Sequence, residues 1–130
     1  MRTEILDYIE TLDLGTYTKS DKLPYTTSGQ SLYLANMKTI YVDQPTYVED
    51  PIVNTLDNVS ISGRISSVTI YFSQDAKSLP ANYGTLVTAL KNAKNITTLT
   101  NIHRRECDVT QTYNNDVLVT EIVIRLTTIQ

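Results

Sequence analysis

Ile65-Ser66-Ser67-Val68-Thr69-Ile70-Tyr71-Phe72-Ser73 is the most regular stretch of the chain, because apolar and polar side chains alternate along it. Successive residues of a β-strand point to opposite faces of a sheet. Val68, Ile70 and Phe72 therefore share one face, and the intervening polar residues share the other. The pattern predicts a strand over residues 65–73 with one face in the core and the other half exposed. A turn at Ser62-Gly63 is expected to join it to a short strand over residues 59–61.

The C-terminal third predicts a β-hairpin. It consists of a strand over residues 105–113, a turn at Asn114-Asn115 and a long strand over residues 116–127. Both faces of that last strand are largely apolar. The even positions are Leu118, Thr120, Ile122, Ile124 and Leu126, and the odd positions are Val117, Val119, Glu121, Val123 and Arg125. Both faces therefore need to be covered.

Two segments have apolar residues at helical spacing. Residues 3–12 place Ile5, Leu6, Ile9 and Leu12 on one side of a helix. A second helix is predicted over residues 79–93, with Asn95 as its stop; its apolar positions are Leu79, Tyr83, Leu86, Val87, Leu90 and Ala93. Each helix therefore offers one apolar side to a sheet.

The segment between the first helix and the central strand is less regular. Residues 15–31 predict a long loop, and loops of this length in compact domains are more often functional or ordered by a partner than idle. A short strand is expected over residues 38–43. Pro45 and Pro51 then bracket a segment that should run along a sheet edge or as a loop, since proline donates no ladder hydrogen bond.

This element order predicts a single α+β domain over residues 1–130. We expect an antiparallel or mixed sheet of about four main strands with two helices packed mainly on one face. The chain shows no internal repeat or composition shift that would divide it. Its 130 residues and 41% hydrophobic content are typical of one domain that buries its own core.

Composition argues against several classes of function. A net charge of −3 opposes attraction to duplex DNA. No apolar run approaches the roughly 20 residues of a membrane-spanning helix, and the acidic N-terminal segment is unlike a signal peptide, so we expect synthesis and residence in the cytoplasm. The single cysteine, Cys107, excludes an internal disulfide and a multi-cysteine metal site.

Residue types that carry catalysis are scarce. His103 is the only histidine, and Cys107 follows it by four residues at a strand entrance, where the two side chains need not meet. The four glycines are far apart, so no phosphate-binding loop is indicated, and the polar run at 114–116 is better read as turn chemistry than as a metal site. We therefore predict no catalytic, cofactor-binding or metal-binding residues. A small enzyme built on His103 and Cys107 remains the alternative.

The second apolar face of the last strand is the candidate functional feature. One layer of helices covers one face of a sheet, and leaving Val117, Val119 and Val123 in water would forgo on the order of a few kcal/mol. A partner protein is the expected cover, although the first helix or the long loop could also fold over this face. The candidate subunit interface is therefore Val117, Val119, Glu121, Val123 and Arg125, with Arg104 and Arg105 as an internal or intersubunit ion-pairing cluster.

Four stretches together resemble the tail terminator proteins of long-tailed bacteriophages. They are the opening helix Arg2-Thr3-Glu4-Ile5-Leu6, the segment from Leu32-Tyr33-Leu34 to Thr39-Ile40-Tyr41-Val42, residues 68–77, and Arg104-Arg105-Glu106-Cys107-Asp108-Val109. The resemblance spans nearly the whole chain and lies in element order and local sequence. Related neck and tail-completion proteins fit almost as well.

The resemblance implies a small α/β subunit that forms a ring, typically a hexamer, on the end of the tail tube. The ring stops tube polymerisation and joins the tube to the head-side connector. The implied partners are further copies of the chain, the tail tube protein and the head-tail connector proteins, with DNA only in passage and no membrane. The implied location is the tail or neck of the virion after assembly in the host cytoplasm. The rival interpretation is a small homodimeric binding module that uses the same strand face.

Overall fold

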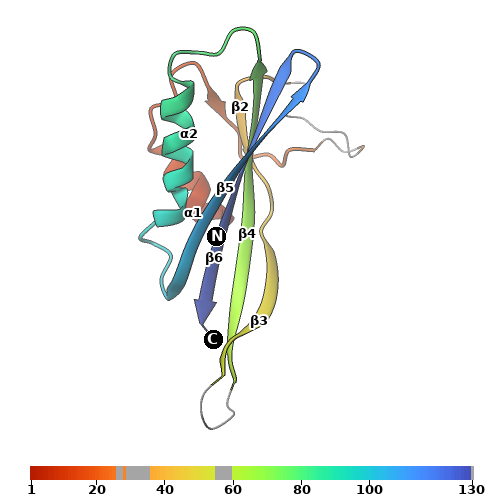
Figure 1. The fold of residues 1–130 in the computed structure, drawn as a ribbon. Helices are drawn as coiled ribbons and strands as arrows, with labels where there is room; N and C mark the ends of the chain where they lie inside the picture. Colours follow the sequence, from red (N-terminus) through yellow and green to blue (C-terminus); the bar gives the residue numbers. More distant parts are fainter. Residues whose placement is uncertain (26–27, 29–35, 55–59, 130) are drawn as a thin grey trace.

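The computed structural model describes residues 1–25, 28, 36–54 and 60–129, and for residues 50–54, 60–62 and 129 it describes the backbone alone. Among the described residues, two helices and six strands form a two-layer α+β fold (Figure 1). The elements are α1 (Arg2–Glu10), β1 (Thr18–Lys19), β2 (Thr39–Val42), β3 (Thr46–Asn54), β4 (Ser60–Asp75), α2 (Tyr83–Lys91), the 3-10 turn η1 (Asn92–Asn95), β5 (Ile102–Asn114) and β6 (Val117–Ile129).

The 16-residue strand β4 organises the sheet. The strand order is β1-β2-β4-β6-β5, and β3 also pairs with β4. β2 and β3 follow one another along the edge of β4 that faces away from β6: β2 pairs at Ile70 and Tyr71, and β3 pairs at residues 60–67. Only β1 and β2 are parallel, so the sheet is mixed.

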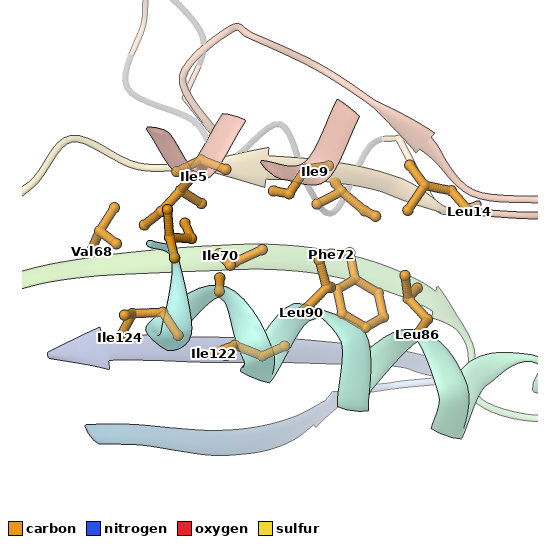
Figure 2. Packing of buried hydrophobic residues seen from close by; sticks show 14 of the residues in the cluster. Ile5, Ile9, Leu14, Val68, Ile70, Phe72, Leu86, Leu90, Ile122 and Ile124 are labelled. Atoms are coloured by element: carbon orange, nitrogen blue, oxygen red, sulfur yellow. The ribbon is translucent and has the colours of Figure 1, made fainter. Parts of the chain in front are cut away.

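Both helices pack on the same face of this sheet (Figure 1). Figure 2 shows Ile5 and Ile9 of α1 and Leu86 and Leu90 of α2 directed toward the strands. The sheet contributes alternate residues of β4 and β6 to this core. The strand residues in the cluster are Ile40, Val42, Val68, Ile70, Phe72, Ile122, Ile124 and Leu126. The core thus lies between the helices and one face of the sheet.

The predicted fold class is confirmed, and so is the placement of the helices on one face. The expected strand count was too low, because the structure has six strands. The predicted break at Ser62-Gly63 is wrong. Gly63 lies within β4 and is paired on both sides, with Asp50 of β3 and Ile129 of β6. Pairing with β3 on one side and β6 on the other holds this glycine in an extended conformation. The neighbouring residues in the sequence had indicated a turn instead.

Other boundaries moved for similar reasons. β1 lies inside the predicted loop 15–31, part of which is outside the described residues. The segment with Pro51 is an edge strand, as one of the two expectations had it, and its register shifts between Pro51 and Val53. Pairing with β4 thus maintains a strand through Pro51, which donates no ladder hydrogen bond. Asn115 has a φ of 55° in the β5–β6 turn, which agrees with the predicted hairpin.

A polar cluster lies among the apolar core residues beside α2. The Tyr17 ring meets Phe72 edge-on at 5.5 Å between centroids, and its hydroxyl donates to the Gln74 side-chain oxygen. Thr120 and Gln74 are fully buried, and the hydroxyl of Tyr83 lies 3.1 Å from that of Thr120. Burial is the main cause that raises the pKa of Tyr17 to about 12. The fold therefore holds this phenol in its neutral form.

Leu79, which precedes α2, and Leu90, which lies near its end, allow a test of which side chains form the core. Leu90 is fully buried and Leu79 is 48% exposed. We expect Leu90→Ala to lower the free energy of unfolding by about 2–5 kcal/mol, because it leaves a cavity. Leu79→Ala is the matched control and should cost less than about 1 kcal/mol. Urea denaturation followed by circular dichroism measures both, and equal losses would contradict this packing.

The raised pKa of Tyr17 predicts that the free energy of unfolding depends on pH. Its pKa rises on folding from about 10 to about 12, so the native state binds the proton more tightly. The resulting stabilisation is fully present below pH 10 and is lost as the pH rises toward 12. Between pH 8 and 11, the free energy of unfolding should therefore fall more steeply with pH for the wild-type chain than for Tyr17→Phe. Denaturation curves recorded at a series of pH values measure it for both chains. Parallel pH profiles would show that Tyr17 titrates as it does in the unfolded chain.

Candidate assembly interface

The face of the sheet that points away from the helices is called the outer face here. The strand register determines its members by rows across β4, β6 and β5. One row is Ser67, Arg125 and Glu106; the next is Thr69, Val123 and Asp108; then come Tyr71, Glu121 and Thr110, followed by Ser73, Val119 and Thr112. Because this parity is opposite to that of the core residues, the helices do not cover these side chains.

Six of the seven predicted interface residues lie on this outer face. The five odd positions of β6 point there, and Arg104 joins them because it is opposite Thr127. Arg105 is opposite Leu126 and therefore lies on the helix side of the sheet. The two neighbouring arginines, expected to act as one cluster, are thus separated by the sheet.

The middle of the outer face is partly covered within the single chain. Val117, Glu121, Val123 and Arg125 are half-buried. Val119 is only 5% exposed, so this valine is largely enclosed before any partner binds. The apolar area left for a partner is therefore centred on Val123 and Val117 rather than on Val119.

Part of that cover comes from Asp43, which directly follows β2. The Tyr71 hydroxyl lies 3.4 Å from the Asp43 carboxylate and donates to it. Burial is the main cause that raises the pKa of Tyr71, and the neighbouring Tyr25 and Asp43 raise it further. Tyr25 belongs to the predicted loop 15–31, and it is itself 46% exposed. The Val123 and Arg125 rows lie two and four residues further along β6.

A chain of opposite charges crosses the Arg125 end of the outer face. Arg125 donates to the Asp108 carboxylate, and its Nε lies 3.8 Å from Glu106. Arg104 is ion-paired with Glu106 in turn. The hydrogen bond to Asp108 is the main cause that raises the pKa of Arg125. Exposed pairs of this kind add little to stability, so their main effect is to present alternating charge next to Val123.

Arg105 has a structural role that the sequence did not indicate. Its guanidinium donates to the carbonyl oxygens of Lys94 at 2.6 Å, Ile96 at 3.1 Å and Leu99 at 3.3 Å. These carbonyls belong to η1 and the connection into β5. Arg105 thus ties that connection to the sheet, and we remove it from the candidate interface. Its partners are backbone atoms brought near by tertiary folding, so no pattern of side chains could have pointed to them.

His103 and Cys107 occupy different environments. His103 is exposed at the β-bulge between Ile102 and Arg104. Cys107 is opposite the buried Ile124 and packs against the core. Burial is the main cause that raises the pKa of its thiol, which lowers the fraction of reactive thiolate at neutral pH. The arrangement favours a packing role for Cys107.

The part of the chain that the structure describes lacks two further features that would point to other functions. Within it, no group of three or more histidine, cysteine or carboxylate side chains converges as a metal site would require. None of the described helices has the length and apolar character needed to cross a bilayer. Neither the known protein-family models nor the curated proteins include a match to this chain. The outer face is therefore the candidate site that the described residues support best.

The two arginines provide a matched test of these assignments. Arg105→Ala should lower the free energy of unfolding by about 1–3 kcal/mol, because three carbonyl oxygens lose a charged donor. Arg104→Ala removes one exposed ion pair and should cost less than about 1 kcal/mol. Thermal and urea unfolding measure the difference. A larger loss for Arg104→Ala would reverse the two roles.

Proposed function

We propose that this chain is a non-enzymatic structural subunit of a bacteriophage virion, a tail terminator that forms a ring on the tail tube and joins it to the head-side connector. The observation that carries the proposal is the half-buried valine surface on the outer face of β6. Among the described elements, both helices lie on the opposite side of the sheet from this surface. Another neck or tail-completion protein is the close alternative within the same class.

A ring requires two different contact surfaces on each subunit, because head-to-tail contacts are heterologous. The outer face supplies one. The hairpin of β3 and the first residues of β4 supplies a second, since it extends beyond the helices and the end of β6 (Figure 1). Its side chains include Val48, which is 61% exposed, and Tyr47, which is 48% exposed and stacks against the Arg64 guanidinium at 3.9 Å.

The charge arrangement fits an assembly contact better than a nucleic-acid contact. The acidic balance of the chain disfavours binding to phosphates, in keeping with DNA that only passes through a ring. At the Arg125 end of the outer face the charges are already paired within the subunit. A partner that covers Val123 therefore meets paired rather than isolated charges on its Arg125 side.

The small homodimeric binding module is the second candidate. It uses the same valine surface, and the distinction lies in symmetry, because an isologous dimer closes after two copies whereas heterologous contacts continue around a ring. Electron microscopy of the chain mixed with tail tubes separates the two. Rings at tube ends support the terminator, and a dimer that ignores tubes supports the binding module.

Val123→Asp tests the outer face directly. The new carboxylate lies beside Asp108, and burying it in a contact is unfavourable, so we expect the monomer to fold but to cap no tubes. Thr85→Asp places the same charge on an exposed position of α2 and should cap tubes like the wild-type chain. Electron microscopy of tubes scores capping, and circular dichroism checks folding.

Two outcomes would count against this scheme in different ways. Capping by Val123→Asp at the wild-type level would remove the outer face from the contact. Tubes left uncapped by the wild-type chain would overturn the terminator function itself.

A further inference from the structure

β5 lies at one end of the strand order, and this position leaves its second edge without a partner among the described strands. In a β-strand, backbone N–H and C=O groups point to both sides, so half of those of β5 point away from β6. The side chains from Asp108 to Asn114 are all exposed. Gln111 donates a hydrogen bond to the Tyr83 hydroxyl of α2 on the helix side of the sheet, and no described strand lies beside this part of the edge. It is a 7-residue template for another strand.

This edge lacks the usual features that prevent strand addition. Native edges are protected by lysines, prolines, bulges or very short length. The stretch Asp108-Val109-Thr110-Gln111-Thr112-Tyr113-Asn114 has no lysine, proline or glycine, and its one charge is held by Arg125. The bulge of β5 is at its other end, between Ile102 and Arg104. Val109 is 36% exposed and Tyr113 is 70% exposed, so the edge instead carries apolar side chains.

We propose that this edge pairs antiparallel with the β5 edge of a second copy, centred on Gln111. A twofold axis perpendicular to the sheet keeps each residue on its own face, so the register can shift only in steps of two residues. With Gln111 at the centre, Val109 of one copy is opposite Tyr113 of the other, Thr110 is opposite Thr112, and Asp108 is opposite Asn114.

This register uses favourable cross-strand pairs throughout. Aromatic with β-branched residues and threonine with threonine are stabilising neighbours in antiparallel pairs, and like charges are destabilising. The register centred on Asp108 would place two aspartates opposite one another. The register centred on Thr110 would place Val109 opposite Gln111 and lose the pairing with Tyr113. The Gln111 register alone among these three joins the two exposed apolar residues.

The pairing produces one continuous sheet across two copies, with both sets of helices on the same side. It leaves the outer face free, so it goes beyond the proposed ring contact and does not depend on it. A 7-residue contact is smaller than the roughly 1,600 Å² of a standard protein interface, so we expect a dimer with a dissociation constant in about the micromolar range.

Sedimentation of the full-length chain over a concentration series tests the existence of the dimer. The wild-type mass should rise from monomer to dimer, and Tyr113→Lys should weaken the dimer at least tenfold, because lysine protects strand edges. Leu79→Lys, at another exposed apolar position, is the control and should dimerise like the wild-type chain. A wild-type chain that stays monomeric throughout, or equal dimerisation by Tyr113→Lys, would overturn the proposal.

Disulfide cross-linking tests the register. In a Cys107→Ser background, mild oxidation of a mixture of Val109→Cys and Tyr113→Cys chains should give a covalent dimer. Either variant alone should not, because like positions are about 13 Å apart along the strand at about 3.3 Å per residue. Efficient cross-linking of one variant alone, or none in the mixture, would refute this register.

These results are independent of the capping assay. A wild-type chain that caps tubes but stays monomeric in sedimentation rejects only the β5 pairing. A Val123→Asp chain that still dimerises but caps no tubes supports both proposed contacts.

Discussion

The ladder between β4 and β6 is the constraint on which the rest of the structure depends. It runs from Gly63 opposite Ile129 to Asp75 opposite Val117. Its register places Ile70 beside Ile122 and Val68 beside Ile124, so the apolar residues of two strands distant in sequence form one surface for the helices. A slip of one residue would turn one of these two sets toward solvent. The hydrophobic core therefore fixes the register.

The same register decides what remains outside the core. Once the even positions of β6 face the helices, its odd positions must face away, and from Val117 to Thr127 they carry three valines, a glutamate, an arginine and a threonine. The chain covers Val119 and leaves Val117 and Val123 half-buried. Arg104 and Arg105 follow the same rule, because adjacent strand residues point to opposite sides. One becomes part of a surface ion-pair network and the other anchors the connection after η1.

The fold thus presents two separate surfaces with different properties. The outer face is a mixture of valine, threonine and paired charge in the middle of the sheet. The β5 edge offers backbone groups with Val109 and Tyr113 beside them. A face recognises a partner by shape and charge, whereas an edge recognises another strand through main-chain hydrogen bonds. The two proposed contacts would therefore join copies of the chain in different ways.

The sequence by itself determined the elements with strong periodicity. The alternation at Val68, Ile70 and Phe72 and the even apolar positions of β6 identified two strands and their core faces, and apolar spacing identified both helices. These signals are local, because packing one side of a helix or strand against the core requires apolar side chains at a regular spacing. Tertiary structure alone decided the continuity of β4 through Gly63, the enclosure of Val119 and the separation of Arg105 from Arg104. Each of these depends on which strand or carbonyl lies alongside, and contacts between distant segments leave no periodic trace in the chain.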